Sequence, residues 1–541
     1  MKGGLVCLLV LLSMLWVMES GATVWGWAAT AGGVNSDRGS RIARDGAGNL
    51  YVTGYFNGGA TFGASTIYGT GQDTFVAKFD PSGYWLWAVP CGGINSDDKG
   101  TDIAVDAQGN CYISGYYRGI GTFGPYTLTP VGATDVFVAK LDSGGNWLWA
   151  ASGGGTDWDY GNGIAVDNLG NCYVTGSFGD TASFGQYSVT LNPADWVCDI
   201  FIAKLDPAGN WLWARRAGGS DPDYGMDVAV DGAGNCYVTG SFYDDVADFG
   251  PDEFTQNECD CAFISKLDTA GNWLWTERAG GSWPCAAGGN GIALDEDGNC
   301  FVTGSFFETI GFGATPLTSN GEEYSDIFIA KLNSAGNWLW AKRAGSTNYD
   351  EGKGICADNA GNCYTTGYFY AAADFGPTNL SSAGYGDVFA CGLDGLGNWL
   401  WAERAGGSSY DNGYGITTDN SGNLFLTGNY NATAGFGDYS LISAGASDLF
   451  AAKLSFQSSP IPRAQENLQI YRNNLNMDLS WDPVTEDTGG QPLTPDGYNI
   501  YISGNNADWA WLDFTPGTAY VHINTALVNG RVFYKVTAVK N

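Results

Sequence analysis

The chain has 541 residues and carries 57 acidic against 24 basic side chains, which gives a formal charge of −33. This charge argues against nucleic acid as a partner, because phosphate binding needs clustered Lys and Arg. The single histidine, His522, excludes most histidine-based catalysis and every metal site with several His ligands. With 44% hydrophobic residues, 82 glycines and 21 tryptophans, the composition excludes global disorder and favours a rigid, turn-rich, aromatic β protein.

The first 22 residues are expected to be a signal peptide. An apolar run begins at Leu5, and the small residues Ser20 and Ala22 fit the cleavage rule, so the mature chain would begin near Thr23. The run is short for a membrane span, and no other stretch is long enough to be one. We therefore expect an exported protein that is extracellular, at the cell surface or in the periplasm, with no membrane span.

A Trp-x-Trp motif recurs seven times. The pairs are Trp25/Trp27, Trp85/Trp87, Trp147/Trp149, Trp211/Trp213, Trp273/Trp275, Trp338/Trp340 and Trp399/Trp401. Each period reads as four strands, which in the third period are residues 163–166, 172–178, 199–205 and 211–214. A four-stranded unit repeated seven times predicts an all-β fold, a seven-bladed β-propeller, in which both indoles of a pair fill the gap between blades.

The order of strands at the two ends predicts a closed ring. The mature chain opens with a strand of the fourth type at residues 24–28, whereas the seventh repeat ends at 448–454 with no Trp-x-Trp after it. We therefore expect the N-terminal strand to complete the last blade, which removes two free sheet edges. The propeller would span residues 23–456.

A second domain is expected after a linker at residues 457–463. Alternating strands begin near Leu468, as is typical of a sandwich. The sequence Leu-Ser-Trp-Asp-Pro at 479–483 and Tyr534 resemble the second strand and the corner tyrosine of a fibronectin type III module. This resemblance implies a small β-sandwich over residues 464–541.

The repeat unit also carries recognisable motifs. They are Gly-x-Ile-Ala-x-Asp, Asp-x-x-Gly-Asn-x-Tyr-Val-Thr-Gly, a Phe-Gly in the long loop, and Asp-x-Phe-x-Ala-Lys-Leu-Asp, with the best copy between Gly163 and Asp206. On these motifs the chain resembles the bacterial SBBP β-propeller repeat, which is found in exported multi-repeat proteins. The resemblance implies the architecture of about residues 24–456, but it implies no catalytic residues and no single ligand.

The motif Asp-x-x-Gly-Asn lies between the first and second strands of every repeat, for instance at 167–171. The acidic run at 295–298 invites a calcium interpretation. A calcium loop needs five or more oxygen ligands, whereas most copies carry one carboxylate. We therefore interpret the motif as a turn in which Asp accepts a backbone N–H and Gly takes a positive φ. No cofactor is expected, with calcium as the alternative.

The longer connections lie on the opposite face of the propeller, which we call the long-loop face. Each second-to-third connection contains Phe-Gly. Because the motif occurs in every repeat, we expect its Phe to anchor a small extra hairpin. These residues are Phe62, Phe123, Phe184, Phe249, Phe312, Phe375 and Phe436.

The long-loop face also gathers acidic and aromatic residues next to the innermost strands. The candidate ligand-binding residues are Asp37, Asp98, Asp159, Asp223, Asp350, Asp411, Trp158, Tyr160, Tyr224, Trp283, Tyr349 and Tyr410. For the aspartates, loop capping is the alternative to a ring of carboxylates that binds cations or a basic partner. A second set of aspartates opens the third strands. Strand register predicts ion pairs for three of them, Asp199/Arg216, Asp326/Arg343 and Asp387/Arg404.

Of 13 cysteines, 12 lie beyond residue 22, and an exported protein permits disulfides. Five share the start of the second strand, where other repeats have Leu, so we expect them to be buried apolar residues. They are Cys111, Cys172, Cys236, Cys300 and Cys363. The expected bridge partners are Cys91, Cys198, Cys259, Cys261, Cys285, Cys356 and Cys391.

No catalytic signature is present in these motifs. The sequence therefore favours a non-enzymatic binding protein that recognises a glycan or a protein ligand with its long-loop face. One alternative is a polysaccharide-active hydrolase or lyase on the same face. The other is a structural component of the cell surface or matrix, assembled through the C-terminal module.

Overall fold

The computed structural model describes residues 23–94, 97–191, 197–243, 246–255, 260–281, 284–321 and 324–456, together with six later strands. The predicted signal peptide and the linker at 457–463 lie outside the described residues. Val24–Ser455 forms one compact unit, and the later strands belong to a second unit. Every regular element among the described residues is a β-strand, and none is a helix that could cross a membrane.

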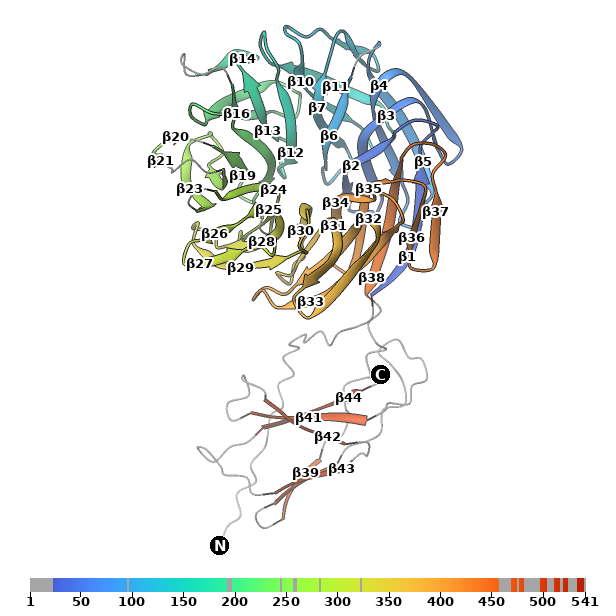
Figure 1. The fold of residues 1–541 in the computed structure, drawn as a ribbon, viewed down its shortest axis with the longest axis vertical. Coiled ribbons are helices and arrows are strands. Elements are labelled where there is room, and N and C mark those ends of the chain that lie inside the picture. The colour runs from blue at the N-terminus through green and yellow to red at the C-terminus, as the bar shows by residue number, and fades with distance from the viewer. Residues whose placement is uncertain are drawn as a thin grey trace. The chain divides into compact units, whose positions relative to one another are not determined.

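Seven antiparallel blades surround one axis in the first unit, which confirms the predicted propeller (Figure 1). The innermost strands are β2 (Arg38–Arg44), β6 (Lys99–Val105), β12 (Tyr160–Val166), β18 (Tyr224–Val230), β24 (Ala286–Leu294), β30 (Glu351–Ala357) and β34 (Asn412–Thr418). We number the blades 1 to 7 by these strands. The second strands are β3 (Leu50–Phe62), β7 (Cys111–Tyr117), β13 (Cys172–Gly179), β19 (Cys236–Phe242), β25 (Cys300–Phe307), β31 (Cys363–Phe375) and β35 (Asn423–Tyr430).

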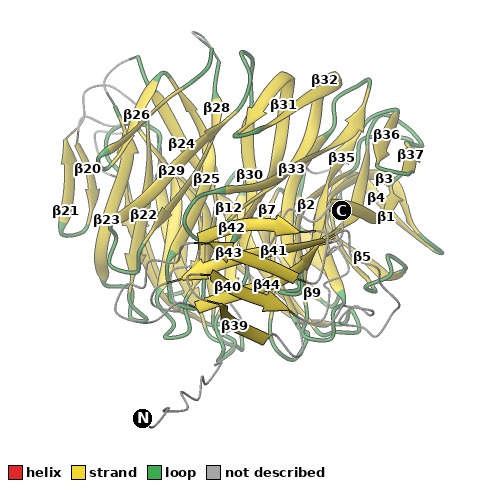
Figure 2. Ribbon diagram, turned by 90° about the horizontal axis from the view of Figure 1, so that it is seen from below, coloured by secondary structure: helices red, strands yellow, loops and turns green. Residues whose placement is uncertain are grey.

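The two outer positions of each blade complete the repeat, and Figure 2 shows the blades from the side. The third strands are β4 (Ser65–Phe79), β10 (Asp135–Leu141), β16 (Cys198–Leu205), β22 (Cys261–Leu267), β28 (Asp326–Leu332), β32 (Thr378–Leu393) and β38 (Asp448–Phe456). The fourth strands are β5 (Trp85–Gly93), β11 (Trp147–Gly153), β17 (Trp211–Ala217), β23 (Trp273–Gly280), β29 (Trp338–Ala344), β33 (Trp399–Gly407) and β1 (Thr23–Ala31).

The N-terminal strand closes the ring, as the strand order predicted. β1 pairs with β38 in a sheet of order β1-β38-β35-β34. The Thr30 hydroxyl donates to the carbonyl of Leu449 (3.2 Å) and shares a hydrogen bond of 2.8 Å with the Tyr430 hydroxyl. Blade 7 is therefore built from both ends of the propeller sequence.

The middle strands are buried on both sides because neighbouring blades cover them. Every residue of β10 is buried. The five cysteines at the start of the second strands are fully buried free thiols, which confirms their expected apolar role. The expected bridges are mostly wrong, since Cys91, Cys198, Cys261, Cys356 and Cys391 are also free. Cys285 does take part in a disulfide, and Cys259 lies outside the described residues.

Successive side chains of each Trp-x-Trp strand point alternately to the solvent and into the gap between blades. Five of the intervening leucines are exposed, for example Leu86 at 51% and Leu148 at 42%, and Leu400 is half-buried. In six of the seven pairs the second indole donates to a carbonyl of the next blade, as in Trp149 to Pro207 (3.0 Å). Both indoles of a strand therefore serve the junction between blades, as the sequence predicted.

Each Phe-Gly forms the tip of a small hairpin, which we call the latch hairpin. In blades 1 and 6 it extends the second and third strands; elsewhere it is formed by β8 (Gly121–Phe123) and β9 (Tyr126–Leu128), β14 (Thr181–Phe184) and β15 (Tyr187–Thr190), β20 (Val246–Phe249) and β21 (Asp252–Thr255), β26 (Thr309–Phe312) and β27 (Thr315–Thr318), and β36 (Thr433–Phe436) and β37 (Tyr439–Ile442). The seven Phe are at most 1% exposed, and the Gly after each has φ between 57° and 73°. The predicted anchoring role is confirmed.

The latch hairpin joins two blades. Its Phe packs edge-on against the first Trp of its own blade, as Phe184 does on Trp211 at 5.0 Å and 70°. Its backbone pairs with the fourth strand of the preceding blade, as Gly154 does with Ser183. The same backbone pairing occurs at all seven junctions.

The second unit contains two three-stranded antiparallel sheets. Their orders are β39-β40-β43 and β42-β41-β44. The strands are β39 (Gln469–Asn473), β40 (Asn476–Ser480), β41 (Gly497–Ser503), β42 (Ala510–Thr515), β43 (Ala519–Ile523) and β44 (Phe533–Val539). This strand content agrees with the expected all-β character, and the sandwich itself stays a prediction.

Substituting Trp25→Ala should destabilise the propeller by about 3–5 kcal/mol, because the indole is 7% exposed and packs against Phe436 at 5.2 Å. Val34→Ala, at a side chain that is 75% exposed, should change stability by less than about 0.5 kcal/mol. Denaturant unfolding followed by tryptophan fluorescence measures both. Equal stability of the two variants would contradict closure of the ring through β1.

Candidate functional site

The six candidate aspartates are buried and hold the loops of the long-loop face. Asp223 accepts the N–H of Gly219 (2.8 Å) and of Tyr243 (3.1 Å). The other five also accept one N–H four or five residues before them and another 20 residues after them. All six are 0% exposed. Loop capping is therefore confirmed, and none of the six carboxylates presents a surface to a ligand in this structure.

Each cap faces a third-strand aspartate across a blade junction. A Cβ placed on Gly406 would lie 2.6 Å from Asp387 Oδ1 and 3.0 Å from Asp411 Oδ2. The six pairs are Asp448/Asp37, Asp73/Asp98, Asp135/Asp159, Asp199/Asp223, Asp326/Asp350 and Asp387/Asp411. At the junction of blades 4 and 5, Cys261 and Ala287 replace both members. The two carboxylates are thus kept or lost together.

Arginine compensates three of these six pairs. The predicted ion pairs of Arg216 with Asp199, Arg343 with Asp326 and Arg404 with Asp387 are all present. Asp73, Asp135 and Asp448 have no ion-pair partner among the described residues, and burial raises the pKa of all three. The uncompensated pairs lie at three consecutive junctions, from blade 7 to blade 3.

The Asp-x-x-Gly-Asn motifs are turns, as interpreted. In the first repeat, Asp45 Oδ1 accepts the N–H of Ala47 (3.0 Å) and of Asn49 (2.8 Å), and Gly48 has a φ of 89°. Oδ2 accepts the side-chain amide of Asn49 (2.8 Å). Both oxygens therefore face N–H donors. In the described part of the chain, no group of three or more His, Cys, Asp or Glu side chains could hold a metal ion.

The predicted aromatic residues are accessible. Exposed fractions are 44% for Trp158, 41% for Tyr224, 54% for Tyr349 and 45% for Tyr410, whereas Tyr160 is half-buried and Trp283 lies outside the described residues. The Tyr160 ring packs against Tyr116 at 4.9 Å. Tyr410 stacks on Tyr385 at 4.8 Å with 15° between the planes. Trp158, Tyr224, Tyr349 and Tyr410, unlike the aspartates, can therefore reach a ligand.

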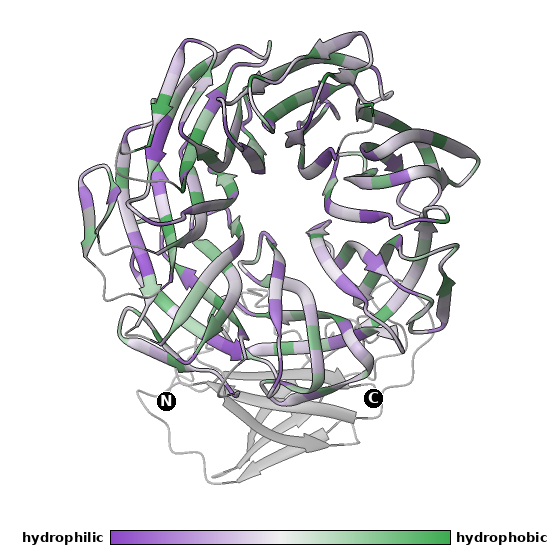
Figure 3. Ribbon diagram, turned by 45° about the horizontal axis from the view of Figure 1, so that its top comes forward, coloured by the Kyte–Doolittle hydropathy of each residue, from purple (hydrophilic) through white to green (hydrophobic). Residues whose placement is uncertain are grey.

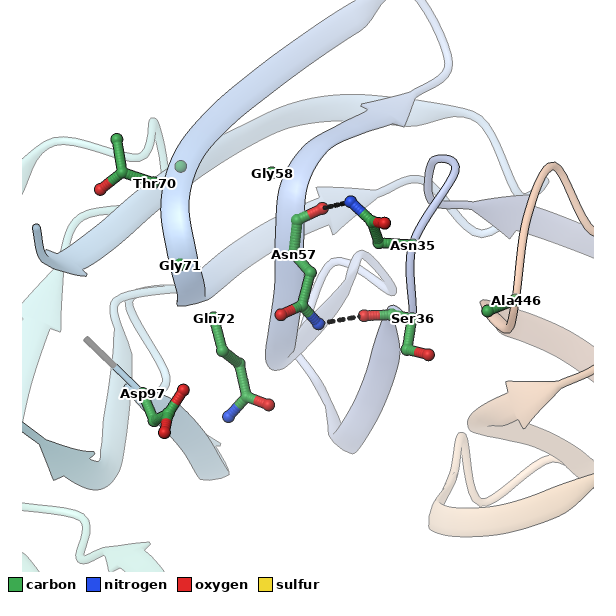
Figure 4. A pocket seen from close by; sticks show the side chains of 10 residues that line it. Asn35, Ser36, Asn57, Gly58, Thr70, Gly71, Gln72, Asp97 and Ala446 are labelled. Carbon is green, nitrogen blue, oxygen red and sulfur yellow. Dashed lines mark hydrogen bonds between the residues drawn. The ribbon is translucent and has the colours of Figure 1, made fainter. Parts of the chain in front are cut away.

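A polar pocket of about 680 Å³ lies between blades 7, 1 and 2 (Figure 4). The side chains that line it include Asn35, Ser36, Asn57, Thr70, Gln72 and Asp97. The side-chain amide of Asn35 donates to the carbonyl of Asn57 (3.2 Å), and that of Asn57 donates to the carbonyl of Ser36 (2.5 Å). The pocket wall is thus held by its own hydrogen bonds and presents amide and hydroxyl groups.

Arg118 connects the pocket to Trp158. One of its guanidinium nitrogens lies 3.7 Å from the Asp97 carboxylate, and its Nε donates to the Thr134 hydroxyl (3.2 Å). The guanidinium carbon lies 4.5 Å from the centre of the Trp158 ring system. Polar pocket, cation and exposed indole therefore form one continuous surface.

Three charged residues at the starts of innermost strands, Arg38, Lys99 and Glu351, were not predicted from the sequence. Seven equivalent positions at the starts of these strands hold Arg38, Lys99, Tyr160, Tyr224, Gly288, Glu351 and Asn412. Figure 3 shows hydrophilic segments on strands around the axis. The residue at this position varies from blade to blade in an otherwise regular repeat. This variation is visible in the sequence and could have indicated these residues.

Comparison with known proteins supports the repeat assignment. Residues 153–177, 212–241 and 400–433 match the SBBP β-propeller repeat family. A WD repeat-containing protein of Acanthamoeba polyphaga mimivirus is 22% identical over 75% of this chain and 36% of its own length. The regulatory protein FlaEY of Caulobacter vibrioides is 31% identical over 31% of this chain and 18% of its own length. The chain thus spans about a third and a fifth of these relatives.

Solved structures align with this chain at low similarity. A gluconolactonase of Xanthomonas campestris aligns over 81% of this chain and 99% of its own, with 13% identity and a TM-score of 0.32. An ulvan lyase aligns over 77% and 97%, with 12% identity and a TM-score of 0.41. Likeness at this level carries no argument about activity.

Lowering the pH from about 8 to about 5.5 should raise the thermal midpoint of unfolding. Burial raises the pKa of Asp37, Asp159 and Asp350 to about 7. The folded chain therefore binds more protons than the unfolded chain between about pH 4 and pH 7, and stability falls as pH rises through this window. Calorimetry at fixed ionic strength measures the effect.

The matched variants separate these groups from the net charge of the protein. Asp350→Asn should flatten part of the pH dependence. Asp142→Asn should leave the pH dependence unchanged. Asp142 is a turn residue whose pKa is lowered by hydrogen bonds from Asn146, so its carboxylate stays charged across this pH range. Identical pH slopes for both variants would contradict the role of the buried caps.

Proposed function

We propose that this protein is a non-enzymatic carbohydrate-binding protein that holds a glycan on its long-loop face. The binding surface is the pocket between blades 7, 1 and 2, extended by Arg118 and Trp158. One observation carries this proposal: a pocket lined by amides and hydroxyls is continuous with an exposed indole.

The chemistry of the surface matches a sugar. Amide and hydroxyl side chains both donate and accept hydrogen bonds, as sugar hydroxyls do. An exposed indole offers an apolar face on which the C–H face of a sugar ring can lie. Asn57 and Arg118 are each held by protein contacts, so little side-chain entropy is lost on binding.

Several features favour binding over cleavage. A glycosidase places two carboxylates at the scissile bond. Among the described residues that line the pocket, the acidic side chain is Asp97. The neighbouring Asp98 is 0% exposed and accepts N–H bonds from Gly93 and Arg118. Release of reducing ends or unsaturated products from a bound glycan would overturn this part of the proposal in favour of a hydrolase or lyase.

The setting we propose is outside the cell or at its surface. The apolar leader at residues 1–22, with small residues at its end, supports export. We also propose that residues 464–541 form a fibronectin type III-like module, which the two three-stranded sheets support. Capture of a protein instead of a glycan, or oligomers that grow with concentration, would favour a protein receptor or a matrix component.

Trp158→Ala should weaken glycan binding about tenfold or more, which corresponds to at least about 1.4 kcal/mol. A glycan array on the mature protein selects the ligand, and calorimetric titration measures its Kd. Tyr84→Ala is the control, because Tyr84 is 73% exposed in a turn between the third and fourth strands, on the opposite face. Equal affinity of the two variants, or no hit on the array, would contradict the proposal.

A further inference from the structure

We infer that the glycan is acidic, and that Arg38 and Lys99 bind its anionic substituent at the propeller axis. The inference rests on the proposed function and specifies the class of ligand. The shared chemistry is a carboxylate or a sulfate ester on a sugar.

Four cations from three blades meet at the axis of a protein with a formal charge of −33. They are Arg38 and Arg41 of blade 1, Lys99 of blade 2 and Lys353 of blade 6, and we call them the axial cluster. Burial, and after it the charges of the other three, lower the pKa of Lys99 to about 7. These side chains therefore share one electrostatic environment.

Two of the four cations are compensated. Lys353 Nζ lies 2.6 Å from Glu351 Oε1. Arg41 donates to the carbonyls of Tyr414 (2.7 Å) and Asn290 (3.1 Å), and its Nε lies 3.9 Å from Asp102 Oδ1. Because Tyr414 belongs to blade 7 and Asn290 to blade 5, Arg41 of blade 1 links three blades across the axis.

Arg38 and Lys99 are left without a carboxylate among the described residues. The guanidinium of Arg38 lies over the Tyr414 ring at 3.4 Å, and its Nε is buried with no hydrogen-bond partner in the described chain. Lys99 Nζ lies 5.7 Å from the centre of the Tyr55 ring. Both side chains are partly buried. Partly buried like charges without a counter-ion cost stability, so an external anion would stabilise them.

The chemistry of the two cations suits an anionic sugar. A guanidinium presents parallel N–H donors to a carboxylate or a sulfate, and an ammonium adds a point charge. Cation–π contacts orient both groups: Tyr414 holds the guanidinium of Arg38, and Tyr55 holds the ammonium of Lys99. The two cations thus suit an anion that presents two or more oxygens, as a carboxylate and a sulfate ester both do.

Room for the rest of the sugar lies opposite the cations. Gly288 of blade 5 occupies the position that Arg38 and Lys99 occupy in blades 1 and 2. A Cβ placed on Gly288 would have one heavy-atom neighbour within 4 Å, the Cβ of Ser241 at 3.8 Å. Gly288 therefore leaves open space at blade 5, between Tyr224 of blade 4 and Glu351 of blade 6.

The axial site adjoins the pocket proposed to bind the glycan. Ser36 and Asp97 line that pocket and stand two residues before Arg38 and Lys99. A chain that lies in the pocket can therefore direct an anionic substituent toward the axis.

Lys99 makes the interaction dependent on pH. The groups that face it are Arg38, Arg41, Lys353 and Tyr55, with Tyr116 across the strand pair and Asp98 and Asp102 on its own segment. Its pKa of about 7 means that it loses its charge as pH rises through neutrality. Affinity for an anion should therefore fall between about pH 6 and about pH 8.5.

The test is calorimetric titration of the mature protein with tetragalacturonate and with its fully methyl-esterified form, which has the same backbone without charge. We expect tight binding of the acid and at least tenfold weaker binding of the ester. Arg38→Gln and Lys99→Gln should each weaken binding of the acid about tenfold or more and leave the ester unaffected. Arg44→Gln, a cation at the other end of β2, is the matched control and should change neither.

Two further measurements make the inference specific. Lys99→Arg should retain affinity at about pH 8.5, where the unmodified protein loses it. The thermal midpoints of Arg38→Gln and Lys99→Gln should equal or exceed that of the unmodified protein, because each removes an uncompensated charge. A sulfated galactan oligosaccharide that binds in place of the uronate, with the same dependence on Arg38 and Lys99, would identify the sulfate ester as the group recognised.

The outcomes separate the two proposals. Equal binding of acid and ester, with loss on Trp158→Ala, would overturn the axial site and leave the carbohydrate-binding function standing. An unmodified protein that binds neither the acid, the ester nor the sulfated oligosaccharide would overturn the axial site. If it also gave no hit on the array, the proposed function would fail too.

Discussion

The packing of one blade against the next is the interaction on which the rest of this structure depends. A single four-stranded blade is an open sheet with two apolar faces, and it is stable only when neighbours cover them. The latch hairpin makes this cover specific, because Phe184 packs on Trp211 of its own blade while Ser183 pairs with Gly154 of the preceding one. β1 extends the same packing to the last junction, where Trp25 meets Phe436.

The requirements of these junctions also decide which residues are free to recognise a ligand. Buried carboxylates such as Asp223 fix the long loops, so the acidic residues that recur in almost every blade serve the architecture. Residues that the repeat does not need can vary from blade to blade. Asn57, Trp158 and Arg38 are of this kind, and they lie on the long-loop face or at its axial mouth. The residues that repeat in the blades thus build the fold, and the residues that differ between blades are available to bind a ligand.

The net charge of −33 describes the molecule as a whole and not its axis. Turn aspartates are repeated with the blades and are held by N–H donors, and several have a lysine nearby, as Asp45 has Lys78 at 3.6 Å. Arg38 and Lys99 have no ion-pair partner among the described residues, although Asp102 and Glu351 pair with the other two cations at the axis. An acidic protein can therefore present a binding site for an acidic sugar.

The sequence by itself determined the strand order, the closure through residues 24–28, the turns around Asp45 and Gly48, and the Arg343–Asp326 pair. These features follow from local spacing and from repetition, since each depends on residues close in the chain or on a strand pairing that every blade repeats. It also suggested ligand binding by the capping aspartates, because a carboxylate's burial cannot be read from its spacing. Only the tertiary structure decided that Arg38, Lys99 and Lys353 meet at one axis. Lys353 stands more than 250 residues after Arg38 and Lys99, and their charges interact because the innermost strands of blades 1, 2 and 6 face one axis, which the spacing within one repeat does not encode.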